Sequence, residues 1–288
     1  MEYITHLAIL FLIYAILGLG LNLVVGYTGL LASGHAAFYG IGAYCSAILI
    51  TNFGVNFFVA LAIAVVVTGA AALLIGIVLS RFSGDYYVLV SLGFNVIAYS
   101  VLVNWQSVTR GPLGIAGIGR PSVFGVGFSS NAAFAVVALL VFLICYFASA
   151  FISNSSLGRV LKAIREDDTA IQVFGYDTFY YKLAVFTVSA GMAAAAGALF
   201  ASYITFIDPS SFTVMESVFI LAIIIFGGLA NLKGSVLGAL ILVLLPELLR
   251  FAGFPLSVAA QMRQAVYGLC LVLLMLYRPQ GLRGEYKL

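Results

Sequence analysis

The feature that most constrains the fold is a long run without fixed charge near the start of the chain. From Tyr3 to Ser80 there is no Asp, Glu, Lys or Arg. A membrane-spanning helix needs about 20 mostly apolar residues, so this run has room for about three spans and their turns. Across all 288 residues, 64% are hydrophobic and 8% charged, against about a quarter charged in soluble domains. Because the polar residues needed to coat a soluble core are missing, the sequence predicts a polytopic membrane protein.

Charge and cysteine usage exclude several other classes of protein. Thirteen Lys and Arg against ten Asp and Glu leave a net charge of +3, too small a surplus to indicate a nucleic-acid partner. Cys45, Cys145 and Cys270 fall inside apolar segments at unrelated spacings, which argues against disulfides and against a metal cluster. The sequence therefore predicts no metal site and no cofactor.

Apolar runs and the breaks between them predict an all-α membrane helix bundle of about eight to ten transmembrane segments. We place nine, at residues 4–25, 30–50, 57–79, 86–103, 132–152, 183–206, 218–229, 236–249 and 264–277. The seventh and eighth are short and interrupted by glycine, so we expect broken or re-entrant helices there. All nine are read as one transmembrane domain over residues 1–288. The distribution of Lys and Arg places the loop at 153–182 and the C-terminus in the cytoplasm.

Small residues recur at intervals of four, the spacing of one helix face. The first group is Gly18, Asn22 and Gly26, and the second is Ser189, Ala193, Gly197 and Ala201. In a lipid environment, such ridges allow close van der Waals contact and interhelical hydrogen bonds. Each ridge is either a static packing surface or a sliding surface in a protein that changes shape, and the sequence leaves both readings open.

Polar residues inside the apolar segments are candidates for a translocation path. The glycine-rich stretch at 26–44 contains Ser33, Gly34 and His35 at or near membrane depth. Non-helical backbone is tolerated there only when it is buried in protein or lines a cavity, and interrupted helices offer free backbone groups to polar solutes. Asn22 and Asn95 are further candidates. Each of these residues either lines a path or forms a hydrogen bond that locks neighbouring helices together.

Carboxylates are scarce within the predicted segments. Asp85, Glu216 and Glu247 stand at segment ends, and no series of buried carboxylates crosses the membrane. Because charged groups at membrane depth are costly and are kept mainly for function, this scarcity argues against an ion-coupled carrier. Such a carrier becomes a candidate if these carboxylates prove to lie deep.

The loop at 153–182 differs in composition from the rest of the chain. Eight of the 23 charged residues lie between Arg159 and Lys182. Asp167 or Asp168 is suited to cap a short helix and Gly175 to end it, and that helix has Ile171 and Phe174 on one side. The segment is either a docking element for a soluble partner or a solvated loop whose charges set the topology.

The sequence resembles the LivM-type permeases of ABC importers for branched-chain amino acids over nearly its whole length. The motifs that carry this resemblance are GLLASGHAAFYGIGAY at 29–44, TRGPLGI at 109–115, GRVLKAIREDD at 158–168, FGGLANLKG at 226–234, LLPELLR at 244–250 and YRPQGL at 277–282. Each motif is weak alone, but their order over some 250 residues is specific.

The resemblance implies a multi-pass subunit of the bacterial inner membrane within a larger importer. A second, LivH-like permease would share the path for a small-molecule substrate, with two cytoplasmic ATPase subunits and a periplasmic substrate-binding protein. The loop matches the family's coupling segment, where the general pattern Glu-Ala-Ala-x3-Gly becomes Thr169-Ala170-Ile171-x3-Gly175. The resemblance thus implies ATPase docking by a set of loop residues: Arg165, Glu166, Asp168, Ala170, Ile171, Phe174 and Gly175.

ATP hydrolysis is expected to belong to another subunit. The sequence contains no Gly-Lys dipeptide and hence no phosphate-binding Walker A loop, so we expect a transport subunit and not an enzyme. A urea or short-amide permease of the same family is an alternative, as is an ion-coupled secondary carrier. An intramembrane hydrolase built on Ser33 and His35 lacks a third catalytic partner.

Overall fold

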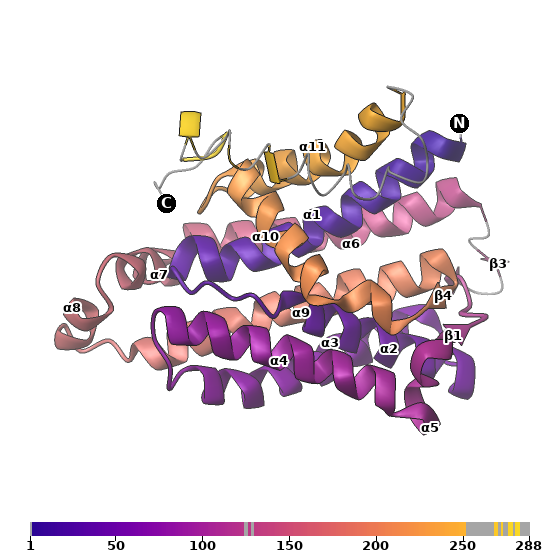
Figure 1. Cartoon of the computed structure of the whole chain (residues 1–288), viewed down its shortest axis with the longest axis horizontal. Coiled ribbons are helices and arrows are strands. Elements are labelled where there is room, and N and C mark those ends of the chain that lie inside the picture. The colour runs from indigo at the N-terminus through magenta and orange to yellow at the C-terminus, as the bar shows by residue number, and fades with distance from the viewer. Residues whose placement is uncertain are drawn as a thin grey trace.

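A computed structural model describes residues 2–123, 126–127 and 130–251 and, near the C-terminus, 268–269, 272, 276–278 and 280–282. The described chain is an all-α bundle, as the sequence predicts (Figure 1). Within these residues, six helices are long and apolar enough to cross a membrane: α1 (Glu2–Thr28), α2 (His35–Phe53), α3 (Phe57–Leu79), α4 (Asp85–Asn104), α6 (Asn131–Asn154) and α9 (Thr178–Ile204). The seventh and eighth predicted segments correspond to α10 (Val214–Gly227) and α11 (Leu232–Phe251), and the ninth lies largely outside the described residues.

Short elements connect the long helices at both ends of the bundle. Helices α7 (Ser156–Glu166) and α8 (Asp168–Val173) lie together at one end, and the N-terminus and the short strands lie at the other (Figure 1). Strand β1 (Ile115–Ala116) pairs antiparallel with β4 (Phe206–Ile207), and β2 (Ser122–Val123) pairs with β3 (Val126–Gly127). The remaining short elements are α5 (Gln106–Thr109) and the 3-10 turns η1 (Gly111–Leu113) and η2 (Pro209–Phe212).

Helices α1 and α9 form the centre of the bundle. In their most apolar 18-residue windows 78% and 72% of residues are buried, against 22% to 28% for α3, α4 and α6. A helix that is apolar on all sides is either buried in protein or faces lipid. Small residues on α1 and α9 allow neighbouring helices to pack closely around these two. A Cβ on Gly197 of α9 would overlap the Tyr39 carbonyl oxygen of α2, so the two backbones are in direct contact.

The small-residue ridges predicted from the sequence lie in these central contacts. Gly18 of α1 faces Ile223, where a Cβ would come within 2.9 Å of Cγ2, and Gly26 faces the backbone of Ala230. Ser189 donates a hydrogen bond of 2.7 Å to the Gly20 carbonyl. Ala193 and Ala201 are completely buried. Both ridges therefore bring helix backbones close together, as such spacing does in membrane bundles.

Two crossings are interrupted by backbone that is not α-helical. Helix α2 begins at His35, five residues later than the segment expected from 30, and residues 29–34 run from the end of α1 into the bundle (Figure 1). Residues 205–213, between α9 and α10, enter the bundle with Phe212 fully buried against Tyr39. Helix α10 has 14 residues and rises about 21 Å at ~1.5 Å per residue, less than the ~30 Å hydrocarbon core. The expected broken crossing therefore agrees with α10. It is wrong for the eighth segment, because α11 is one continuous helix of 20 residues and not the short, interrupted segment expected at 236–249.

Candidate functional site

Helix α7 joins the loop end of the bundle to the central helix α1. Its inner face buries Leu161 and Ile164, while its outer face is polar. The Arg165 guanidinium donates a hydrogen bond to the Gly26 carbonyl in the last turn of α1, where carbonyls lack helical partners and a cation is favoured. Lys162 Nζ lies 5.6 Å from the centre of the Tyr27 ring. Two basic side chains of α7 therefore contact the end of α1.

Helix α8 begins at a side-chain cap, as the sequence predicts. The Asp167 carboxylate accepts a 3.0 Å hydrogen bond from the Ala170 amide and a 2.6 Å bond from the Thr169 hydroxyl. These hydrogen bonds favour the ionised carboxylate and lower the pKa of Asp167. Gly175, with φ at +87°, takes the left-handed conformation just past the helix. Local sequence chemistry thus fixes both ends of this short helix.

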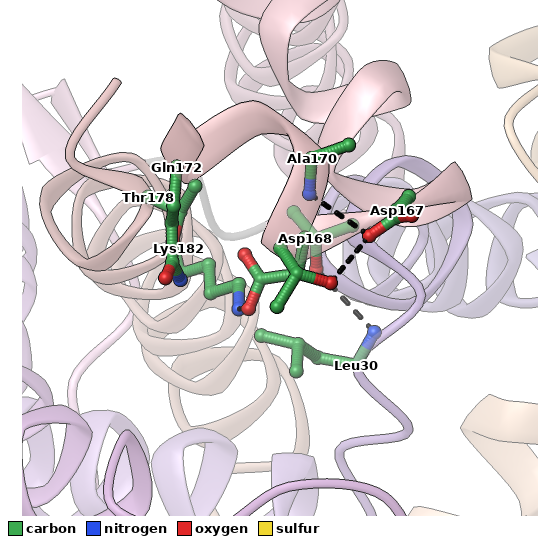
Figure 2. A network of polar contacts seen from close by, with 9 residues as sticks. Leu30, Asp167, Asp168, Ala170, Gln172, Thr178 and Lys182 are labelled. Carbon is green, nitrogen blue, oxygen red and sulfur yellow. Dashed lines mark hydrogen bonds and ion pairs between the residues drawn. The ribbon is translucent and has the colours of Figure 1, made fainter. Parts of the chain in front are cut away.

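Polar contacts tie α8 to the start of α9. Lys182 Nζ lies 2.7 Å from Asp168 Oδ2, and Gln172 donates a 3.0 Å hydrogen bond to the Thr178 hydroxyl. Figure 2 shows Lys182 reaching Asp168 beside the capped turn of Asp167 and Ala170. The segment at 156–177, which we call the docking segment, is therefore attached to both central helices, to α1 through Arg165 and to α9 through Asp168.

The tip of the docking segment is apolar and uncovered. Val173 and Phe174 are 87% and 77% exposed, and Tyr176 and Tyr180 are also exposed. Ala170 and Ile171 are half-buried, and Glu166 is exposed. The sequence places Ile171 and Phe174 on one side of the helix; the structure adds Val173 and leaves Ile171 partly covered. Adjacent large apolar side chains after a capped helix are the signal that could have identified Val173.

A second set of predicted residues gathers where α2 and α10 begin. The Ser217 hydroxyl accepts a 2.9 Å hydrogen bond from the Ala36 amide and one of 3.2 Å from the Asn95 side chain. Asn95 is completely buried, and its Oδ1 has no hydrogen-bond partner among the described residues. Three helices, α2, α4 and α10, therefore meet at one polar point inside the bundle.

The other candidates for the path make contacts between neighbouring segments. The Ser33 amide donates a 3.1 Å hydrogen bond to the Ser91 hydroxyl, and Gly34 lies against the Ser91 carbonyl so closely that a Cβ would approach it to 2.5 Å. The His35 ring is buried and hydrogen-bonds the backbone of Leu17. These contacts hold the non-helical segment 29–34 between α1 and α4.

Asn22 belongs to a separate network on α11. Its amide donates to the Ser235 hydroxyl at 2.6 Å and to the Asn231 carbonyl at 3.1 Å, and its Oδ1 accepts from the Ala230 amide at 3.0 Å. With three partners, Asn22 joins α1 to the turn before α11. Within the described ranges, no group of three His, Cys, Asp or Glu side chains is arranged to hold a metal ion.

Comparison with known proteins identifies relatives along almost the whole chain. It is 38% identical over 299 aligned residues to the high-affinity branched-chain amino acid transport system permease protein LivM of Escherichia coli K12, covering 96% of this chain and 69% of that protein. It is 28% identical over 292 residues to the permease protein LivH of the same organism, covering 94% and 91%. A probable LivM of Methanocaldococcus jannaschii is 27% identical over 60% of this chain and 53% of that protein. No solved structure matches.

The family assignment rests on nearly complete coverage. Residues 3–275 match the family described as "Branched-chain amino acid transport system / permease component". The match includes every transmembrane candidate helix from α2 to α9 and all but the first residue of α1. The docking segment and both interrupted crossings also lie inside it. The chain therefore belongs to the branched-chain amino acid transport permease family, as a multi-pass protein of the inner membrane.

Proposed function

We propose that this chain is a permease subunit of an ABC importer that moves branched-chain amino acids into the cell. It forms the translocation path with a second, LivH-like permease, receives the solute from a periplasmic binding protein, and is driven by two cytoplasmic ATPase subunits. The names of the LivM and LivH relatives support the solute class. Similarity to both LivM and LivH over most of the chain supports pairing with a permease of the same fold.

The observation that carries the coupling role is the docking segment. Its tip exposes Val173 and Phe174, and burial of two such side chains in a partner is favourable by roughly 1.5 to 3 kcal/mol each. Its base is attached to α1 and α9, the most buried helices. A displacement of the tip by an ATPase is therefore passed to the centre of the bundle and not only to its surface.

The substitution Phe174→Asp tests this role in the complete importer. A carboxylate in the docked interface loses the apolar contact and must be desolvated, so we expect the ATPase subunits to dissociate or ATP-driven leucine uptake in proteoliposomes to fall at least about tenfold. Ile171→Asp, nearer the base, should have the same effect. Leu113→Asp is the matched control, because Leu113 is 83% exposed and lies in η1 at the opposite end of the bundle.

Two results would contradict the proposal. Wild-type uptake and ATPase binding by both docking-segment variants would remove the coupling role of this segment. Leucine uptake in energised vesicles without ATP or ATPase subunits would instead identify an ion-coupled carrier, for which a buried carboxylate is required; Glu216, which the structure buries in the first turn of α10, would be that group.

A further inference from the structure

The first turn of α10 places a carboxylate inside the bundle. Glu216 Oε1 is buried and has no hydrogen-bond partner among the described residues, while the Tyr14 hydroxyl of α1 hydrogen-bonds the same side chain. A carboxylate within membrane segments is costly, and such groups are retained chiefly where they contact a solute, an ion or a proton. One hydrogen bond from a tyrosine leaves most of the acceptor capacity of Glu216 unused.

Two further oxygen atoms without partners lie around Glu216. Asn95 Oδ1 and the Tyr39 hydroxyl are buried and have no hydrogen-bond partner in the described part of the chain. Asn95 donates a 3.2 Å hydrogen bond to Ser217, the residue after Glu216. The Tyr39 ring packs against Phe212, four residues before Glu216 in the turn that leads into α10. Glu216, Asn95 and Tyr39, from three helices, form what we call the acceptor cluster.

The surroundings of the acceptor cluster are aromatic and contain no fixed positive charge from its own helices. The Tyr14 ring meets Phe219 edge to face at 5.1 Å, and Tyr39 meets Phe212 at the same distance. No Lys or Arg occurs in α1, α2, α4 or α10, the four helices that meet here. The cluster therefore combines a carboxylate, two neutral oxygen atoms and apolar walls.

We infer that the acceptor cluster binds the ammonium group of an amino-acid substrate during its passage through the permease. An ammonium group has three N–H donors and no acceptor, which matches the three unpaired oxygen atoms of Glu216, Asn95 and Tyr39. Hydrogen bonds between ionised partners are the strong ones, and the aromatic walls suit an aliphatic side chain. The inference rests on the proposed function, because it assigns a site to that solute.

The substitution Glu216→Gln tests the cluster in the reconstituted importer. The amide keeps the shape of the side chain and its capacity to accept from Tyr14, but it removes the charge. We expect leucine uptake to fall about tenfold or more, while ATP hydrolysis stimulated by the loaded binding protein stays within about twofold of wild type. Glu247→Gln on α11, where Tyr3 hydrogen-bonds the carboxylate, is the matched control and should transport normally. Uptake by Glu216→Gln within about twofold of wild type would overturn the inference.

A second measurement does not depend on that variant assembling. A diazirine analogue of leucine is loaded through the binding protein into the wild-type complex, crosslinked during turnover, and mapped by mass spectrometry. Labelling of α10 near Glu216 or of α4 near Asn95 is expected, and labelling confined to other helices would overturn the inference. If the wild-type complex takes up no leucine with ATP present, the proposed function itself fails, a result separate from both outcomes above.

Discussion

Arg165 forms a hydrogen bond between the docking segment and the most buried end of α1. Its guanidinium donates to the Gly26 carbonyl, and its side chain also packs beside Gly29, where a Cβ would come within 3.2 Å of Arg165 Cγ. Movement of α7 therefore acts on the last turn of α1 and on the start of the non-helical segment 29–34. A long cation at a helix C-terminus is suited to this role because both the hydrogen bond and the helix dipole favour it.

Arg165→Met should uncouple transport from ATP hydrolysis. Methionine keeps much of the apolar stem but cannot donate to Gly26, so α7 loses this hydrogen bond to α1 while the contact between Lys162 and Tyr27 remains. We expect the number of leucine molecules imported per ATP hydrolysed to fall about fivefold or more. Arg159→Met is the control, since Arg159 is exposed on the same helix. An unchanged ratio in Arg165→Met would show that α1 does not receive the movement through this residue.

The ionisation of Asp167 should determine how the stability of α8 depends on pH. Its pKa lies below the usual value because Thr169 and Ala170 donate to the carboxylate. A carboxyl whose folded-state pKa is depressed stabilises the fold fully above its unfolded pKa, near 3.9, and loses that effect as the pH falls through the lower folded value. Hydrogen-exchange protection of α8, corrected for intrinsic rates, should thus be constant from about pH 7 to 5. Asp167→Ala should lower it across that range; equal protection in both chains would exclude the cap.

The two carboxylates Asp167 and Glu216 show what a sequence alone reveals at the scale of a residue. The cap at Asp167 and the stop at Gly175 were predictable because their partners lie within a few residues. The burial of Glu216 was not, because it depends on Tyr14, more than 200 positions earlier, and on the path of residues 205–213. The sequence indicates only that Glu216 stands at the end of an apolar segment.

At the scale of the elements, the packing of α9 against α2 requires a glycine. Gly197 faces the backbone of α2, and a Cβ there would overlap the Tyr39 carbonyl and come within 2.7 Å of the Ala43 amide nitrogen. Gly191, on the same helix, would place its Cβ 3.4 Å from Val65 Cγ1, an ordinary contact. The two glycines thus form a matched pair, one in backbone contact and one beside a side chain.

Gly197→Ala should destabilise the protein, and Gly197→Leu should prevent normal assembly. Overpacking costs roughly 1 to 3 kcal/mol, and two backbones cannot repack as side chains do. Gly191→Ala should be neutral or stabilising, because alanine is favoured over glycine in a helix by up to ~1 kcal/mol. Thermal unfolding in detergent and transport activity measure both effects. Wild-type stability and uptake with leucine at 197 would show that the contact between α2 and α9 is not required.

The interrupted helices explain where prediction of elements from the sequence failed. Apolar residues continue through Leu30 and Leu31, so the second segment was predicted to begin at residue 30, five residues before α2 begins. The break exists because distant side chains satisfy backbone amides within it and in the first turn of α2. Ser91 accepts from the Ser33 amide and Ser217 accepts from the Ala36 amide. Such partners cannot be recognised from a short stretch of sequence. By contrast, α3, for which no long-range polar contact of this kind is found among the described residues, was predicted with its observed bounds.

At the scale of the whole molecule, the two ends of the bundle differ in charge. The end that carries α7 and α8 also carries several basic side chains in or beside its loops, among them Arg81, Arg159, Lys162, Arg165 and Lys182. At the opposite end, Arg110 and Arg120 flank the turn η1 and strand β1. Because Lys and Arg are retained on the cytoplasmic side, the docking segment should face the cytoplasm, the side from which the proposed ATPase subunits would bind.

Cysteine labelling from one side of the membrane tests this orientation. Phe174→Cys and Leu113→Cys place exposed thiols at opposite ends of the bundle, since these side chains are 77% and 83% exposed. An impermeant maleimide added to spheroplasts should label Leu113→Cys and not Phe174→Cys, and inverted vesicles should give the reverse. The parent chain, whose Cys45 and Cys145 lie within α2 and α6, provides the background. Labelling of Phe174→Cys from outside would place the docking segment beyond the reach of any cytoplasmic ATPase, and the coupling proposal would then have no physical basis.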